Sequence, residues 1–320
     1  MSILNAIGNT PLVQLMRVVP PDAARVVAKL EYANPTGSMK DRMALAAIGA
    51  AESDGRLHRG GTVVEYTGGT TGVSLAFVCA AKGYKLRIVF SDAFSQEKAL
   101  MMEALGAQIS MVPSQGRGIT EKLIKEMIET SRTISQQPEH WWSDQLNNRD
   151  AIKGYYPLGE EIWRQTEGRV TAFVHVVGTA HSIHGTTAGL WKHRRSIHVV
   201  AVEPTESAVL SGGGSGAHNI EGIGIGFTPP LWEADQVNEV MTVSTDEAKA
   251  MARRLAREEG IFGGTSSGAN VVAAIRIAQR LGPKATVATI IVDSGLRYLS
   301  TDVFRRASTY GGTEICAQHL

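Results

Sequence analysis

Short apolar segments rich in β-branched residues alternate along the chain with segments of helical period. The apolar segments predict strands at 62–66, 86–90, 108–112, 172–177, 197–203 and 285–293. The periodic segments predict helices at 71–83, 95–107, 119–132 and 185–194. Ser244 and Glu247 form a capping-box pattern, which predicts a further helix that runs to Gly260. All-apolar strands between helices are typical of parallel sheets covered on both faces, so we expect an α/β fold of two three-layer units with mostly parallel sheets.

Composition narrows the class of protein. Lys and Arg total 32 and Asp and Glu total 31 among 320 residues, so the net charge of +1 offers no basic surface for nucleic acid or anionic lipid. The two cysteines, Cys79 and Cys316, exclude a disulfide framework or a multi-cysteine metal site. No apolar stretch is long enough for a membrane span and no signal peptide is evident, so we expect a cytoplasmic protein.

Three loops rich in Gly, Ser and Thr follow predicted strands, where α/β folds bind their ligands. They are "EYTGGTTGVS" at 65–74, "VVGTAHSIHGTT" at 176–187 and "GGTSSGAN" at 263–270. Glycines let the backbone approach a ligand, and a helix start presents free N–H groups to an anion. The G-x-G-x-x-G and G-x-x-x-x-G-K-[ST] patterns are both absent, which disfavours dinucleotide and nucleoside-triphosphate chemistry. Taken singly, each loop fits a turn without a ligand equally well.

The segment "NPTGSMKDR" at 34–42 holds a lysine in an unusual position. Ser38 is the expected N-cap, which places Lys40 in the first turn of a helix. The helix dipole disfavours a cation there, lowers the pKa of the amine and favours the neutral form that Schiff-base chemistry needs. The alternative is a solvated surface lysine beside Asp41.

Six segments occur in an order that resembles one enzyme family. They are "NPTGSMKDR", "TGGTTG", the glycine loop after "FVHVV", "EGIGIGF", "GTSSGAN" and "VDSGLRYLST". Over about residues 5–305 the chain resembles the cysteine synthase and cystathionine β-synthase family, the fold type II enzymes that depend on pyridoxal 5′-phosphate. The resemblance implies this cofactor, a small amino-acid substrate and a homodimer.

The resemblance also implies roles for individual residues. Lys40 corresponds to the catalytic lysine, which forms a Schiff base with the cofactor and moves a proton at the substrate α-carbon. Cofactor binding is implied for Lys40, Thr70, Gly178, Thr179, Ala180, His181, Ser182 and Ser266. Substrate binding is implied for Thr67, Gly68, Gly69, Thr71, Gln145 and Gly222. Ser266 corresponds to the serine that bonds the pyridine nitrogen, an arrangement that favours α,β-elimination through an aminoacrylate.

The chain departs from the family pattern in two loops. Gly68 and Thr70 stand where the family has serine and asparagine, and we expect the missing side chain at Gly68 to enlarge the substrate pocket. Ala180 and His181 replace two glycines of the phosphate loop, where a Cβ restricts positive φ. The ring of His181 either donates to the phosphate or points away from it. His175, His181 and His184 lie close in sequence, but no carboxylate or cysteine joins them locally, so no metal site is expected.

The function implied is β-replacement on an activated serine such as O-acetylserine, with sulfide or another nucleophile. The alternatives are β-elimination, the synthesis of a specialised amino acid, and a paralogue that binds without catalysis. We expect a smaller α/β domain at 35–146, a larger one formed by 1–34 and 147–306, and a C-terminal tail at 307–320.

Overall fold

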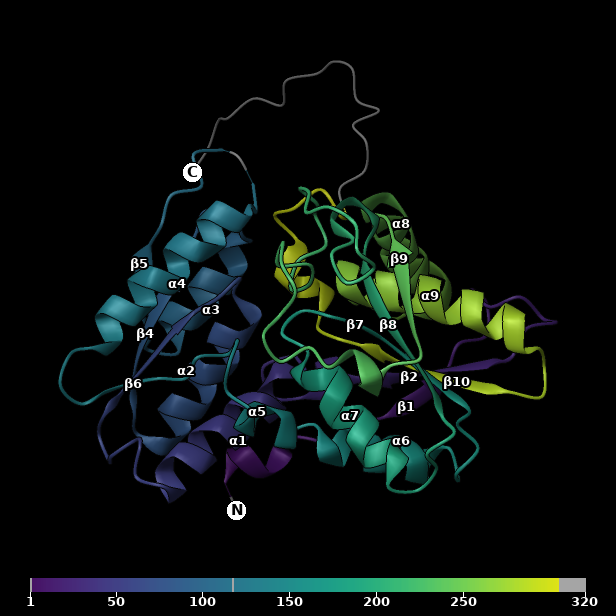
Figure 1. Ribbon diagram of the computed structural model, residues 1–320, viewed down its shortest axis with the longest axis horizontal. Helices are drawn as coiled ribbons and strands as arrows, with labels where there is room; N and C mark the ends of the chain where they lie inside the picture. The colour runs from purple at the N-terminus through teal and green to yellow at the C-terminus, as the bar shows by residue number, and fades with distance from the viewer. Residues whose placement is uncertain (1, 117, 305–320) are drawn as a thin grey trace, which may run out of the picture.

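Two sheets rich in parallel strands stand side by side in the computed structural model, which describes residues 2–116 and 118–304 (Figure 1). The larger sheet has the strand order β1-β2-β10-β7-β8-β9, and the smaller has the order β5-β4-β3-β6. Among the described strands only β1 runs antiparallel to its neighbour. The α/β class with mostly parallel sheets, predicted from the sequence, is confirmed.

The six predicted strands lie where the apolar segments placed them, to within two residues. The bounds of the described strands are β1 Leu12–Gln14, β2 Arg25–Leu30, β3 Thr62–Tyr66, β4 Lys85–Phe90, β5 Gln108–Met111, β6 His140–Trp142, β7 Ala172–Val176, β8 His198–Pro204, β9 Glu239–Val243 and β10 Thr286–Ile291. Sequence reasoning missed β1, β2, β6 and β9. Three of these lie at sheet edges, where burial is partial and the apolar pattern weak.

The helices connect the strands and cover the sheets. Their bounds are α1 Lys40–Ser53, α2 Thr70–Lys82, α3 Gln96–Ala104, α4 Glu121–Ser135, α5 Asp150–Lys153, α6 Tyr156–Gln165, α7 His181–Trp191, α8 Thr245–Arg254 and α9 Thr265–Leu281. In Figure 1, α8 and α9 lie above the larger sheet and α6 and α7 below it. Strands β3, β7 and β10 are buried along their whole length, as sheets covered on both faces require.

Helix ends test the expected caps. Ser244 and Glu247 form both bonds of the capping box, and the helix continues through a π turn to Gly260, as predicted. Ser95 precedes α3, but its buried hydroxyl makes no capping bond and has no hydrogen-bond partner within residues 2–116 and 118–304, so the cap expected there is absent.

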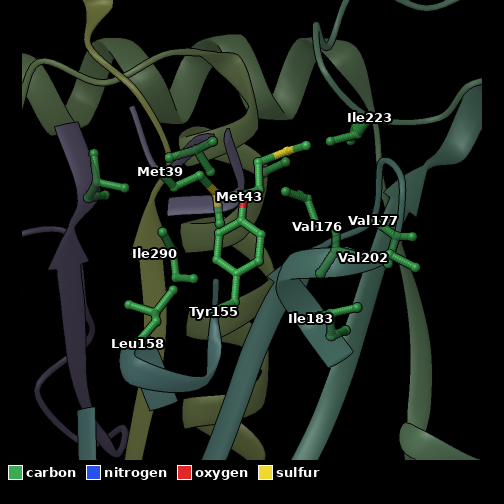
Figure 2. Packing of buried hydrophobic residues seen from close by; sticks show 14 of the residues in the cluster. Met39, Met43, Tyr155, Leu158, Val176, Val177, Ile183, Val202, Ile223 and Ile290 are labelled. Carbon is green, nitrogen blue, oxygen red and sulfur yellow. The ribbon is translucent and has the colours of Figure 1, made fainter. Parts of the chain in front are cut away.

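The apolar core extends directly beneath the start of α1. Figure 2 shows Met39 and Met43 beside Tyr155 and Ile290, all of them fully or almost fully buried. Tight packing on one side holds the first turn of α1 in place, because core side chains occupy defined positions. The residue that follows Met39 is Lys40.

We propose domain limits that follow the two sheets. All strands of the smaller sheet come from residues 62–142, which fits a domain at 35–146. The strands of the larger sheet come from residues 12–30 and 172–291, which fits a domain formed by 1–34 and 147–306. The expected tail at 307–320 and Cys316 lie outside the described residues.

Candidate active site

Lys40 is fixed at the start of α1 by backbone bonds to the end of β10. Gly37 accepts from the amide of Ser294, and Met39 donates to the carbonyl of Val292 over 3.0 Å. The hydroxyl of Ser38 accepts the Lys40 amide over 3.2 Å, although the cap position itself falls on Met39. The lysine therefore stands at the carboxyl end of the larger sheet, where ligands of α/β folds bind.

The amine of Lys40 lies between two adjoining cavities. One cavity is lined by Lys40 together with Thr70, His175, Ser182, Ser266 and Asp293. The other is lined by Lys40 together with Thr67, Gly68, Thr70, Thr71, Phe94, Gln145 and Thr179. Both include Gly178 and Gly222, so they form one continuous site.

Burial lowers the pKa of Lys40 to about 8, and the charge of Asp293 only partly offsets this effect. The sequence argument reached the same direction from the helix dipole, but burial is the larger cause. A neutral amine is consequently available near neutral pH, which is the form that attacks a carbonyl carbon.

We expect the rate at which Lys40 reacts with pyridoxal 5′-phosphate to rise about tenfold per pH unit up to pH 8 and then level off, because about one amine in ten is neutral at pH 7. The measurement is stopped-flow absorbance of apoprotein mixed with the cofactor between pH 6 and 10, with Lys40→Ala as the blank. A rate that still rises tenfold between pH 9 and 10 would show an ordinary, solvated lysine.

The glycine loop after β7 leads into the start of α7. A Cβ on Gly178 would lie 2.4 Å from the carbonyl oxygen of Gly222, so only glycine allows this close contact. Ala180 takes a φ of +69° directly before α7, a conformation that costs a non-glycine residue about 1–3 kcal/mol. The helix is retained despite this strain, and its first N–H groups remain available to an anion.

The ring of His181, which replaces a glycine of this loop, is held by two contacts within the protein. Its Nε2 lies 3.1 Å from the carbonyl oxygen of Asn148, and its Nδ1 lies 2.8 Å from the hydroxyl of Thr179. Both ring nitrogens are therefore engaged within the protein. Burial and then the charge of Lys40 lower the pKa of His181 to about 3, so the ring is neutral.

The loop that follows β3 folds on its own side chains. The hydroxyl of Thr67 accepts from the amides of Gly69 and Gly72 over 2.9 and 3.3 Å. Thr71 donates to the side-chain oxygen of Gln145 over 2.9 Å. Of the substrate residues inferred from the resemblance, those that line this cavity are Thr67, Gly68, Thr71, Gln145 and Gly222, whereas Gly69 does not line it.

A buried carboxyl group supports Gln145 from behind. Glu65 accepts the amide of Gln145 over 2.9 Å and the hydroxyl of Ser143 over 2.6 Å. Burial raises its pKa to about 8, although these donors act in the opposite direction. Sequence reasoning missed this residue, because a glutamate inside a buried strand gives no signal without its partners.

The space freed at Gly68 is filled, which corrects the expectation of a larger pocket. A Cβ at Gly68 would lie 2.9 Å from the ring of Phe94. The aromatic ring therefore takes the volume that a serine side chain would need. The loop loses a polar donor and gains an apolar wall.

Asp293 is the main cavity residue to which the sequence assigned no role. It follows β10, accepts from Tyr298 over 2.7 Å and from Thr70 over 3.4 Å, and is 2% exposed. Its second carboxylate oxygen is buried and has no partner among the described residues. The signal for it was its place at the end of the last strand, in the motif "VDSGLRYLST".

The arrangement fits an aldehyde that carries a phosphate. Lys40 supplies the amine, and the free N–H groups at the start of α7 form a cradle for an anion. The close packing at Gly178 brings the backbone near this cradle. Ser266 lines the same cavity as Lys40. The unpaired oxygen of Asp293 leaves a buried acceptor that a donor group of such a ligand would satisfy. These features define a lysine-dependent enzyme of the pyridoxal-phosphate class.

Comparison with known proteins gives the family. The family model for pyridoxal-phosphate dependent enzymes matches residues 3–293, and the chain belongs to that family. A cysteine synthase from Staphylococcus aureus is 40% identical over 306 residues, which cover 95% of this chain and 96% of the relative. The resemblance inferred from six sequence segments is thereby confirmed.

Solved structures agree over nearly the whole chain. A cysteine synthase from Entamoeba histolytica superposes with a TM-score of 0.89 at 34% identity, covering 98% of this chain and 92% of that one. An O-acetylserine-dependent cystathionine β-synthase from Helicobacter pylori gives a TM-score of 0.88 at 35% identity, covering 95% and 98%.

Two further features limit the kinds of site. Within residues 2–116 and 118–304, no three or more His, Cys, Asp or Glu side chains are grouped so as to hold a metal ion. His184, one of the three histidines considered for a metal, accepts the amide of Glu233 over 3.1 Å. In the same ranges no helix is both long and apolar enough to span a membrane.

Proposed function

We propose that this protein binds pyridoxal 5′-phosphate and catalyses β-replacement on an activated serine, with O-acetylserine as the donor and sulfide as the nucleophile. The observation that carries the proposal is the amine of Lys40, with its lowered pKa, at the junction of two cavities. One is lined by residues that the resemblance assigns to the cofactor, and the other by residues that it assigns to the substrate. The relatives named cysteine synthase support the choice of donor and nucleophile.

When bound, the cofactor supplies an electron sink that stabilises negative charge at the substrate α-carbon. Lys40 would hold the cofactor, and its amine would act as the base that takes the α-proton of the substrate. The start of α7 and the loop Gly178–Ser182 hold the phosphate. Ser266 and Thr70 line the cavity beside the ring.

The loop at 67–71 binds the substrate carboxylate in this proposal. Backbone N–H groups at the start of α2 point to that position, and the bond between Thr71 and Gln145 orients both polar side chains. Phe94 and Ile119 form an apolar wall of the same cavity. The homodimer stays a prediction, which sedimentation velocity tests.

The test is a set of parallel assays on the cofactor-loaded protein. With O-acetylserine and sulfide we expect cysteine formation to exceed the rates with O-phosphoserine or with homocysteine as nucleophile. Cysteine alone as substrate tests β-elimination, measured as released sulfide. Faster sulfide release than cysteine formation would replace β-replacement by β-elimination as the function, and turnover with none of these substrates would contradict the proposal.

A further inference from the structure

A chain of hydrogen bonds runs from α9 through β7 to the anion cradle. The side-chain nitrogen of Asn270 lies 3.2 Å from Nδ1 of His175, and Nε2 of His175 lies 2.8 Å from the hydroxyl of Ser182. All three residues are at least nine-tenths buried. His175 and Ser182 line the cavity that contains Lys40. Neither Asn270 nor His175 has a role in the function proposed above.

The orientation of the Asn270 amide is fixed by the backbone. Its oxygen accepts the amide of Val176 over 2.7 Å, and its nitrogen donates to the carbonyl of Ile290 over 2.8 Å. A flipped amide would place the side-chain nitrogen against the amide of Val176, donor against donor, and the side-chain oxygen against the carbonyl of Ile290, acceptor against acceptor. The second hydrogen of the nitrogen is therefore directed to Nδ1 of His175, which must accept it.

The tautomer of His175 follows from this contact. A neutral ring that accepts at Nδ1 carries its hydrogen on Nε2, and that hydrogen is donated to the oxygen of Ser182. Burial, and then the charge of Lys40, lower the pKa of His175 to about 3, so the ring stays neutral at working pH. The hydroxyl of Ser182 is thus used as an acceptor, and its own hydrogen is left for another partner.

Thr179 shows the opposite polarity in the same loop. Nε2 of His181 faces a carbonyl oxygen, that of Asn148, and so carries the ring hydrogen. Nδ1 then accepts from the hydroxyl of Thr179, whose hydrogen is directed away from the cradle. Of the two hydroxyls between residues 178 and 182, that of Thr179 is already used as a donor to His181, so the hydroxyl of Ser182 is the one that can donate to an anion in the cradle.

We propose that Asn270 and His175 are positioning residues that orient the Ser182 hydroxyl as the side-chain donor to the phosphate in the cradle at the start of α7. This inference rests on the proposed binding of pyridoxal 5′-phosphate. It assigns to residues on β7 and α9 a function in phosphate selectivity, and it explains why a histidine occupies a fully buried strand position.

The experiment measures the affinity of the apoprotein for two ligands, pyridoxal 5′-phosphate and pyridoxal, by fluorescence titration. A hydrogen bond to a charged group is worth about 1.5–3 kcal/mol, so Ser182→Ala is expected to weaken the phosphorylated ligand about tenfold to a hundredfold. Its effect on pyridoxal is expected to be small. His175→Leu is expected to reproduce most of the loss, and the double variant to add little to either single one.

Thr289→Val is the matched control, because it removes another buried hydroxyl, which donates to the carbonyl of Val174 and does not line the cavity. It is expected to leave the ratio of the two affinities unchanged. If His175→Leu binds both ligands like the wild type while Ser182→Ala loses the phosphorylated one, the positioning role of Asn270 and His175 is overturned and the proposed function is not. A wild-type protein that binds neither ligand would overturn both the positioning role of Asn270 and His175 and the proposed function.

A second measurement reads the tautomer of His175 directly in the wild-type protein. Nitrogen-15 NMR of histidine-labelled protein distinguishes the two neutral tautomers, with His175→Gln to assign the signal. We expect the Nε2-protonated form at all pH values between 6 and 9. We also expect the phosphorus-31 NMR signal of the bound cofactor to change its chemical shift in Ser182→Ala. A ring protonated at Nδ1, or an unmoved phosphorus signal, contradicts the proposal.

Discussion

Replacing Lys40 by alanine is expected to lower the rate of β-replacement by at least about 10²–10⁴-fold, the usual contribution of a positioned acid–base group. The loss is expected in kcat, because the residues around the substrate carboxylate remain in place. The measurements are cysteine formation and the visible absorbance of the cofactor-loaded protein. Turnover within tenfold of the wild type would mean that Lys40 is not the catalytic lysine.

Two controls separate chemistry from folding. Burial lowers the pKa of Lys40 to about 8, whereas the lysine of the unfolded chain has its ordinary pKa of 10.5. Below pH 8 the protonated amine is therefore less favourable in the folded state than in the unfolded chain, and it lowers the stability of the fold. Removing the amine is therefore expected to leave the unfolding temperature of the apoprotein unchanged or raised at pH 7. Lys40→Arg keeps a cation that cannot become neutral, and it is expected to be as inactive as Lys40→Ala.

The parts of the site that follow from local sequence could be predicted. Lys40 lies two residues after a serine and is the first residue of a helix, and Gly178 follows a buried strand; both patterns act within a few residues. The carboxyl ends of parallel strands then bring such loops to one edge, whatever their separation along the chain. For this reason the candidate residues of three loops converge on one pair of cavities.

The parts that depend on distant contacts could not be predicted. Phe94 fills the space beside Gly68, and a ring 26 positions away leaves no trace in the pattern "TGGTTG". His175 was considered only as a metal ligand, because its partner Asn270 lies 95 residues further along the chain. The position of His181 depends equally on the carbonyl of Asn148.

Replacing Arg42 by alanine is expected to destabilise the protein by about 3–5 kcal/mol, the cost of breaking a buried ion pair by removing one partner. Arg42 is 4% exposed and makes paired bonds of 2.7–2.9 Å to Glu31 and to Glu161. Lys29 lies 2.7 Å from Glu161 but leaves Glu31 without an equivalent partner. The variant therefore buries a carboxylate with no cation against it.

Urea unfolding of the apoprotein measures this loss. Arg56→Ala is the matched control, because Arg56 pairs with Asp54 and Asp150 on the surface, where such pairs contribute about 0–1 kcal/mol. Equal losses in the two variants would show that the buried cluster does not stabilise the fold. Arg42 lies two residues after Lys40 on α1, so a smaller loss of stability with a large loss of cofactor affinity would assign it to positioning the lysine.

The same cluster gives the protein a definite acid sensitivity. Burial alone would raise the pKa of Glu161, but the bonds and charges of Arg42 and Lys29 outweigh it and lower the pKa to about 2. The unfolded chain, with an ordinary glutamate pKa of 4.5, binds more protons between those values, so stability is present above pH 4.5 and is lost as pH falls toward 2. Glu161→Gln is expected to flatten that part of the stability profile. Its stability is also expected to be lower at pH 7, because Arg42 and Lys29 then share one carboxylate fewer.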